Sequence, residues 1–445
     1  MFSKLTVTNF FSIHEPVTLS LDHNYSPADI FKQNTLFTYY DDHKKRSILN
    51  GAIIYGANAS GKTNVLLAFA FIRLLIAKSY TYTEKADFAI TPNAFQFSPT
   101  KAPTSQFSVS FIEPNFQENE AIKFTYQLAI NTTTLEIQEE SLTYQKVLKT
   151  TLSKAITIFT RQKGRIPEKS THLKKLFNKI EQENITYKSI LSILIHDINK
   201  EYFHQEIESP AYKVVQCLAT EITKGFQTKQ FDGNSLEAFA EQINKDSGFK
   251  QEILETLYDF DFAIQDFSVT DMTDNLLESI EQATFSDDVK AQLIATTKKN
   301  RRFEISTAHI VDDVKYPLSM SMESDGTKKF LESSIRLFDA LQHEILFISD
   351  EFDNKYHTKI QEGLLNKFIH QENERKAQFI IATHNPLLLN PDRFAKEQVI
   401  FIQKDRETQA SEVFSLSEFH EITYDNHNWT NLYLDGRFGA VPEVF

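Results

Sequence analysis

The chain has 445 residues, more than one ordinary domain core needs, so we expect more than one lobe. Its composition, 41% hydrophobic and 24% charged, excludes wholesale disorder, and its single cysteine, Cys217, excludes an internal disulfide and a cysteine-based zinc site. The net charge of −13 argues against a surface wrapped in nucleic acid.

The first third of the chain is predicted to be mixed α and β structure. Alternating apolar residues predict strands over 2–8 and 17–21, a pattern unlike the apolar core of a signal peptide. A short apolar strand over 48–55 then leads into a helix over 65–77, an apolar run too short to span a bilayer. We therefore expect a cytoplasmic protein with no membrane contact. Alternation and β-branched content predict further strands over 95–97, 106–112, 122–130 and 139–144.

The middle of the chain, from about residue 168 to 300, has a different pattern. Apolar residues recur there at i, i+3 and i+4 with charges between them, which predicts amphipathic helices. No sustained heptad occurs, so we expect a compact helical insertion and no long coiled coil. The predicted helical stretches are 171–183, 186–201, 211–224, 235–258 and 286–298.

From residue 303 the chain returns to alternating helices and strands. We expect helices over 326–343 and 357–372, and apolar strands over 344–349, 378–383 and 399–403. Continuous apolar strands separated by helices are typical of a parallel sheet covered on both faces. The predicted organisation is therefore 1–150, 151–302 as a mainly helical insertion, and 303–445.

The strongest motif is a predicted phosphate-binding loop, Gly56-Ala57-Asn58-Ala59-Ser60-Gly61-Lys62-Thr63. It fits the pattern G-x4-G-K-[ST], follows an apolar strand and opens an apolar helix, which is the structural context such a loop needs. Backbone N–H groups and the helix dipole would hold phosphate there. Lys62 would reach the β- and γ-phosphates, and the Thr63 hydroxyl would bind Mg²⁺.

A second motif places two acids after a buried strand. Four of the five residues before Asp350 are apolar, and Asp350 and Glu351 follow directly. Adjacent carboxylates are costly in such a place unless a cation or a reaction needs them. Asp350 would hold Mg²⁺, and Glu351 would orient or deprotonate the attacking water.

Two further candidates depend on their context. His384 follows the next predicted strand, at the edge where parallel sheets bind ligands, and there it would sense the γ-phosphate. Taken alone, such a histidine is more often structural. Ser324 and Gly326 stand before a predicted helix, where they either form a plain helix cap or bind phosphate.

Together these motifs resemble the ABC-type ATPase heads of the SMC/RecF group. The resemblance is closer to prokaryotic ATP-binding proteins of the RloA/AbiL and overcoming-lysogenization-defect kind, which are associated with phage defence. In this comparison Gly56–Thr63 matches the Walker A loop, Asp350-Glu351 the Walker B acids, and His384 the switch histidine. The remaining matched segments are Leu5–Phe10 (first strand), Ser324–Thr327 (signature), Asp353 (D-loop) and the ending Tyr433–Pro442.

The resemblance implies an α/β fold: an ABC-type P-loop ATPase head with a mostly parallel central sheet, an antiparallel β subdomain and a helical insertion. It implies ATP and Mg²⁺ as cofactors, and two protomers that sandwich the nucleotides so that Ser324 and Gly326 act in trans. Phe11 stands where related heads often carry an arginine, and Gln96 is the candidate Q-loop residue. The implied nucleotide-binding residues are Gly56, Asn58, Ala59, Ser60, Gly61, Lys62, Thr63, Asn64, Ser324 and Gly326.

Other enzyme classes fit the sequence less well. No correctly spaced N-K-x-D motif for guanine recognition occurs, and a small-molecule kinase would not explain the acids at 350–351 or His384. Only 61 residues follow His384, too few for a Toprim nuclease domain. Asp259 and Asp261 end a helical stretch and are interpreted as solvated surface.

Two functions remain open. The first is an ATP-driven sensor or switch in an antiphage system that controls a separate effector, such as a Toprim-like nuclease. The second is a repair-type ATPase that binds nucleic acid through the basic segment 149–180, which holds nine basic residues and one acid. That segment could equally be solvated or contact an acidic partner protein.

Overall fold

The computed structural model of the chain describes residues 1–98, 102–117, 120–198, 209–223, 226–228, 240, 243, 247–299, 302–353, 357–369, 376–424 and 428–441. The chain divides into two compact units. Unit 1 comprises Met1–Lys229, Ala340–Asp353 and Leu365–Phe445, and unit 2 comprises Gln230–Asp339 and Asn354–Leu364. Each unit is described by itself.

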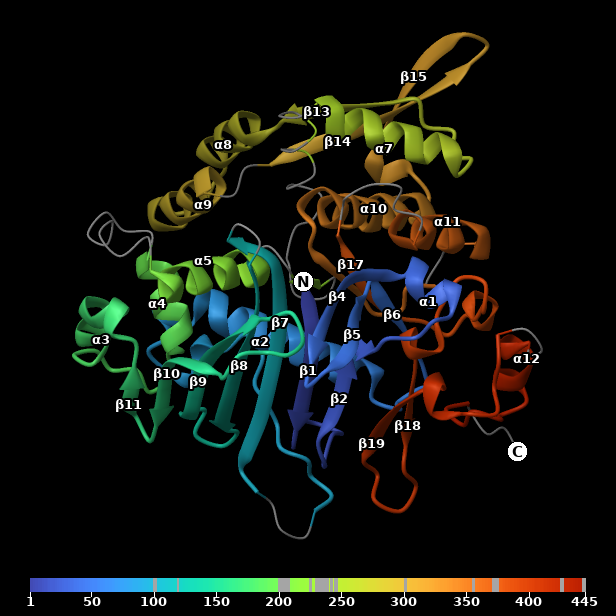
Figure 1. The fold of residues 1–445 in the computed structure, drawn as a ribbon. Coiled ribbons are helices and arrows are strands. Elements are labelled where there is room, and N and C mark those ends of the chain that lie inside the picture. Colours follow the sequence, from blue (N-terminus) through green and yellow to red (C-terminus); the bar gives the residue numbers. More distant parts are fainter. Residues whose placement is uncertain are drawn as a thin grey trace. The chain divides into compact units, whose positions relative to one another are not determined.

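A six-stranded sheet in unit 1 carries the predicted motifs (Figure 1). Four of its strand pairs are parallel, and the edge pair β18–β19 is antiparallel. Every residue of β6, β16 and β17 is buried, as expected for strands covered on both faces. In spatial order the strands are β12 (Phe226–Thr228), β16 (Leu346–Ser349), β17 (Gln378–Ala382), β6 (Gly51–Tyr55), β18 (Val399–Lys404) and β19 (Ser411–Ser415).

The strand expected over 48–55 is two strands, which corrects that prediction. β5 (Lys44–Leu49) belongs to a small sheet, and β6 begins at Gly51. Between them the buried Asn50 side chain donates to the Asn34 side-chain oxygen at 2.9 Å and accepts from Gln398 at 2.7 Å. These amides satisfy one another where the chain leaves one sheet for the next.

A seven-stranded antiparallel sheet forms the other large layer of unit 1. Helix α2 (Lys62–Lys78) packs on its apolar face, where Phe69 lies 5.2 Å from Phe2 and Phe71 lies 5.0 Å from Phe107, measured between ring centroids. In spatial order the strands are β11 (Arg165–Lys169), β10 (Ile156–Gln162), β9 (Ile137–Val147), β8 (Glu120–Asn131), β7 (Thr104–Gln117), β1 (Phe2–Thr8) and β2 (Val17–Ser20).

This sheet corrects two predictions. The expected strand over 95–97 is irregular chain, in which the Phe95 N–H donates to the Asn9 side chain at 2.9 Å instead of entering a ladder. The hairpin β10–β11 continues the antiparallel sheet into residues assigned to the helical insertion. The β10 sequence ITIFTRQ is rich in β-branched residues, which favour pairing with β9 over a helix.

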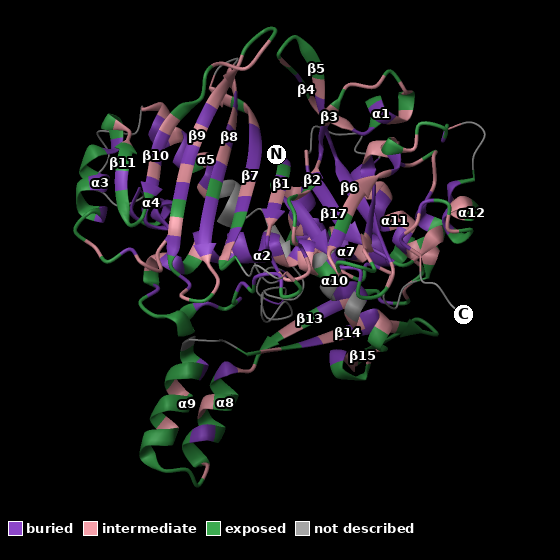
Figure 2. Ribbon diagram, turned by 90° about the horizontal axis from the view of Figure 1, so that it is seen from below, coloured by how far each residue is buried: buried purple, intermediate pink, exposed green. Residues whose placement is uncertain are grey.

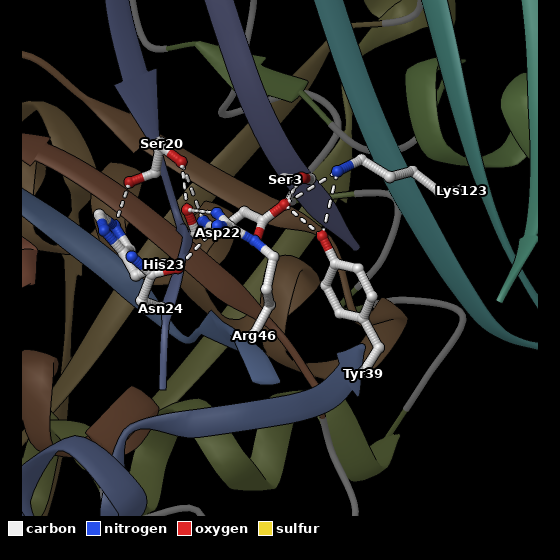
Figure 3. Close-up of polar contacts among 8 residues, drawn as sticks. All are labelled: Ser3, Ser20, Asp22, His23, Asn24, Tyr39, Arg46 and Lys123. Carbon is white, nitrogen blue, oxygen red and sulfur yellow. Dashed lines mark hydrogen bonds and ion pairs between the residues drawn. The ribbon is translucent and has the colours of Figure 1, made fainter. Parts of the chain in front are cut away.

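A three-stranded sheet of β3 (Asp22–Asn24), β5 and β4 (Thr35–Asp41) completes the strands of unit 1. Figure 3 shows the buried carboxylate of Asp22 at its junction with the seven-stranded sheet. It lies 2.8 Å from the Arg46 guanidinium and 3.0 Å from the Lys123 ammonium, and it accepts a hydrogen bond of 2.6 Å from Tyr39. This cluster ties β5, β4 and β8 to one carboxylate.

The helical prediction for the middle of the chain holds in part. Its described helices are α3 (Lys174–Ile180), α4 (Ile190–Ile198), α5 (Pro210–Thr223), α7 (Ser247–Asp259), α8 (Thr273–Gln282) and α9 (Asp287–Lys299). The predicted helical residues 199–201, 224, 235–239, 241–242 and 244–246 lie outside the described residues. In unit 2, α8 and α9 are largely exposed (Figure 2), and a sheet of β13 (Asp266–Asp271), β14 (Phe303–Val311) and β15 (Val314–Ser319) was not predicted.

The helices and strands predicted from residue 326 onward are present, with α10 (Asp325–His343) before β16 in the sequence and α11 (Thr358–Ile369) after it; the predicted helical residues 370–372 lie outside the described residues. β19 and α12 (Trp429–Leu434) were not predicted, and neither was the short helix α1 (Asp29–Gln33) near the start. By length and composition Lys62–Thr81 is apolar enough to cross a membrane, and 61% of its most apolar 18-residue window is buried inside the protein; a buried core helix passes the same test.

Candidate functional site

The predicted phosphate loop connects a buried strand to a buried helix. β6 ends at Tyr55, Gly56 is buried, and α2 begins at Lys62. Two loop residues have positive φ, Ala59 at 61° and Gly61 at 109°. Such left-handed residues turn successive backbone N–H groups inward, which is the geometry of an anion-binding loop at a helix N-terminus.

Both loop glycines are also required by close packing. A Cβ at Gly61 would collide with the Ser411 hydroxyl, and a Cβ at Gly56 would collide with the backbone carbonyl of Ile402. Either collision involves a strand of the same sheet, so a larger residue would push the loop away from β18 and β19. The glycines of the motif therefore serve the packing of the loop as well as its backbone conformation.

The Lys62 side chain lies across the loop and is buried. Its ammonium donates to the carbonyl oxygens of Gly56 at 2.8 Å and Ala57 at 3.0 Å. Burial lowers the pKa of Lys62 from its usual value, because a desolvated ammonium is disfavoured. Three nearby acids oppose that shift: Asp350, Asp353 and Glu351. The lysine therefore sits between the loop carbonyls and a cluster of carboxylates.

The phosphate loop and the predicted acid pair meet directly. The Thr63 hydroxyl donates to a carboxylate oxygen of Asp350 at 2.6 Å, although the two residues lie 287 positions apart. β17 lies between β6 and β16 in the sheet, and both loops leave the same edge. A hydroxyl and a carboxylate at this separation are hard oxygen ligands that fit Mg²⁺, which usually keeps waters and substrate phosphates as its other ligands.

Glu351 and His384 lie at the same edge and are exposed. Glu351 has a φ of 50°, and its N–H donates to the Asp350 carboxylate at 3.0 Å. The N–H of His384 donates to the Asp353 carboxylate at 3.1 Å, which links the end of β17 to the loop after β16. The structure thus brings Asp350, Glu351 and His384 to one edge with the loop, while their catalytic roles stay predictions.

Other predicted residues lie as follows. Asn58 and Ala59 are exposed on the loop, whereas the Ser60 side chain is buried and its hydroxyl has no hydrogen-bond partner among the described residues. The Gln96 side chain donates to the carbonyl of Ala94 at 2.7 Å, and its assignment to the Q-loop stays a prediction.

The signature residues belong to unit 2. Ser324 is exposed, and its hydroxyl accepts a hydrogen bond from the Thr327 N–H at 3.0 Å, which caps the start of α10. Gly326 lies in the first turn of that helix. The structure therefore bears out the helix cap, and phosphate binding by Ser324 and Gly326 stays a prediction.

Sequence reasoning missed two serines that hold the loop. The Ser411 hydroxyl, at the start of β19, lies 2.7 Å from the Ser60 carbonyl oxygen and 2.7 Å from the Ser12 hydroxyl. The Asn64 side chain donates to Ser12 at 2.7 Å, so this predicted nucleotide-binding residue also braces the loop. Isolated serines carry no sequence signal, because their contact depends on β19 returning beside the loop.

These features define a P-loop nucleotide-binding protein. The chain belongs to the AAA domain family described as "AAA domain, putative AbiEii toxin, Type IV TA system", whose model matches residues 52–390. That range contains the phosphate loop, the acid pair and His384, but not the ending at 433–442. Family membership places the chain among AAA-domain proteins, a class that suggests ATP hydrolysis.

A solved structure, the SMC head domain from Thermotoga maritima, is similar to this chain at 13% identity and a TM-score of 0.37. The alignment covers 93% of this chain and 98% of that one. No curated protein matches the sequence.

Proposed function

We propose that this protein binds and hydrolyses ATP and acts as the switch subunit of a prokaryotic antiphage system. The observation that carries the proposal is the 2.6 Å contact between Thr63 and Asp350. It joins a phosphate loop to an acid at the end of a neighbouring strand, which is the arrangement that P-loop ATPases use to hold Mg²⁺ and nucleotide.

Each residue has a role in the proposed reaction. The loop N–H groups and Lys62 bind the phosphates, and Thr63 and Asp350 would hold Mg²⁺, which neutralises charge on the β- and γ-phosphates when bound. Glu351, exposed beside Asp350, accepts the proton of the attacking water. His384 contacts the γ-phosphate from the next strand end.

The proposal extends to an oligomer. Ser324 is exposed at the N-terminus of the 19-residue helix α10, where it could reach a phosphate held by a second copy of the chain. The resemblance to ABC-type heads implies this trans arrangement, in which ATP closes the dimer and hydrolysis opens it. Control of a separate effector, such as a Toprim-like nuclease, rests on the resemblance to the RloA/AbiL group alone.

The alternative is a repair-type ATPase that binds nucleic acid through residues 149–180. The structure weakens its basis, because Arg161 is buried and Lys169 and Lys179 form ion pairs with acids of the same unit. Lys154 and Lys163 lie at opposite ends of β10. Three of the nine basic charges are therefore buried or neutralised by acids of the same unit.

ATP binding by purified wild type, Lys62→Ala and Lys78→Ala tests the proposed site. Lys78 ends the same helix α2 and is exposed, so it is the matched control. Loss of a charged hydrogen bond to phosphate should weaken binding about 10- to 100-fold in Lys62→Ala and leave the control unchanged. Equal affinity of Lys62→Ala and wild type would show that the loop does not bind nucleotide.

A further inference from the structure

The loop that carries His384 is held by a helix from the end of the chain. Thr430, in the second position of α12, places its hydroxyl 3.1 Å from the carbonyl oxygen of Pro386 and 3.1 Å from that of Leu389. Pro386–Leu388 is a single 3-10 turn directly after His384. The hydroxyl thus contacts both ends of this turn.

A second contact holds the loop from the strand that leads into the phosphate loop. The hydroxyl of Tyr55, the last residue of β6, donates to the Asn385 carbonyl at 3.2 Å. The Tyr55 ring is fully buried and lies 5.3 Å from the ring of Tyr433 in α12. Tyr55 therefore touches the loop of His384, the tail helix and the start of the phosphate loop.

A third contact comes from the acidic edge, where Asp353 accepts from the His384 N–H at 3.1 Å. Within the loop, the Asn385 side chain accepts from the Leu387 N–H at 3.1 Å. Three separate segments therefore fix the backbone around a histidine whose own side chain is exposed. Since packing does not hold that side chain, its position follows from the backbone.

The tail is itself built to be rigid. The Tyr433 hydroxyl donates to the Ala440 carbonyl at 3.2 Å, and Gly436 and Gly439 adopt positive φ of 74° and 65° to make the return. Phe438 packs against Phe401 of β18, with ring centroids 5.3 Å apart. The chain 433–441 thus folds back onto the sheet and anchors α12 beside the loop; residue 442 of the ending lies outside the described residues.

We propose that α12, through Thr430 and Tyr433, is a positioning element for His384. It fixes the loop that presents the histidine and connects it, through Tyr55, to the strand before the phosphate loop. The inference rests on the proposed function in so far as His384 acts in ATP hydrolysis. Thr430 and Tyr55 are positioning residues, because neither is placed to touch the nucleotide phosphates.

The test uses the full-length protein with Thr430→Val, Thr430→Ser as rescue, and Thr296→Val as control. Thr296 is also a helical threonine whose hydroxyl donates to a backbone carbonyl, but it lies in α9 of unit 2. Hydrogen–deuterium exchange of the peptide covering 384–389 is measured by mass spectrometry. Loss of one hydrogen bond should speed its exchange about five- to tenfold in Thr430→Val only.

Turnover supplies the second readout. Thr430→Val should lower kcat for ATP by about five- to tenfold with nucleotide affinity unchanged, and Thr430→Ser should keep the wild-type kcat. When Thr430→Val is combined with His384→Ala, turnover should fall no further than in His384→Ala alone. Unchanged exchange in Thr430→Val overturns the positioning role, as does an equal loss of turnover in the His384→Ala background. If His384→Ala alone turns over ATP at the wild-type rate, the proposed role of His384 in hydrolysis fails. The hydrogen–deuterium exchange of the 384–389 peptide then still tests whether α12 fixes this loop.

Discussion

The two large sheets of unit 1 place their polar side chains in different positions. In the six-stranded sheet the strands β6, β16 and β17 are wholly buried and contain no Asp, Glu, Lys, Arg or His; the acids 350–351 and His384 follow the ends of β16 and β17. In the seven-stranded sheet polar residues alternate within the strands. One register row crosses five strands: Thr6, Ser108, Gln127, Ser141 and Thr160.

The same difference separates the proposed catalytic carboxylate, Glu351, from a structural carboxylate, Glu140. Glu140 lies inside β9 and is buried, and its carboxylate accepts from Ser189 at 2.7 Å and from the Ile190 N–H at 2.9 Å. It also faces Arg161 at 3.7 Å. Its hydrogen-bonding capacity is used within the fold, whereas Glu351 is exposed at a strand end beside Asp350. A buried carboxylate whose oxygens are occupied by hydrogen bonds within the fold therefore serves stability. A carboxylate exposed at the end of a strand can act on a substrate.

The largest expected effect tests the exposed acid. Glu351→Gln should lower ATP turnover about 10²- to 10⁴-fold, the usual contribution of a general base, while ATP binding is retained. The ATP-bound oligomer should then accumulate, which light scattering measures as an increased mass. The unfolding midpoint should not change, because the side chain is exposed. Wild-type turnover in this variant would remove Glu351 as the base.

Removal of the buried carboxylate, Glu140, should instead lower the stability of the protein. Glu140→Ala leaves the buried Arg161 with backbone carbonyls but without a carboxylate partner, and the loss of a buried charge partner typically costs about 3–5 kcal/mol in the free energy of unfolding. Glu139→Ala, at the neighbouring exposed position of β9, is the control and should change stability by about 0.5 kcal/mol or less. Urea unfolding measures both. Equal stabilities for the two variants would contradict the structural role of Glu140.

The sequence alone predicted the features of the six-stranded sheet that depend on local pattern. The phosphate loop and the strand before Asp350 are contiguous motifs whose burial follows from their apolar runs. Thr63 and Asp350 were each predicted to hold Mg²⁺, and their observed contact agrees with the placement of both segments at one edge of the sheet. The pairing of Glu140 with Arg161 could not be predicted, because it depends on the register of β9 and β10 and on α4. For the same reason Arg161 was counted in a basic surface although it is buried.

A second buried carboxylate, Asp22 in β3 of the three-stranded sheet, is expected to make stability depend on pH in acid. Burial by itself raises the pKa of Asp22, but Lys123, the Tyr39 hydroxyl and Arg46 outweigh it and hold that pKa below its usual 3.8. Its stabilising contribution is therefore complete above the unfolded pKa and is lost as pH falls through the lower folded pKa. Asp22→Asn should cost about 1.5–3 kcal/mol near neutral pH, the range for hydrogen bonds to charged groups.

That difference between wild type and Asp22→Asn should begin to shrink below about pH 4, where the carboxylate of the unfolded state takes up its proton, and should be lost as the pH falls through the lower pKa of the folded state. Urea unfolding at neutral and acidic pH measures it. A difference that stays constant with pH would mean that the cluster in Figure 3 stabilises the protein through packing and not through charge.

The smallest expected effect concerns the basic segment of the antiparallel layer. Lys174 and Lys175 are exposed on α3, so they are the residues of 149–180 best placed to meet a phosphate backbone. Each lost phosphate contact would reduce the slope of log affinity against log salt by about 0.9. Because Arg161 is buried and Lys169 and Lys179 are paired with acids, we expect Lys174→Glu with Lys175→Glu to leave that slope unchanged within about one contact. If the slope instead fell by the amount expected for about two phosphate contacts, nucleic acid would again be a candidate partner of this basic segment.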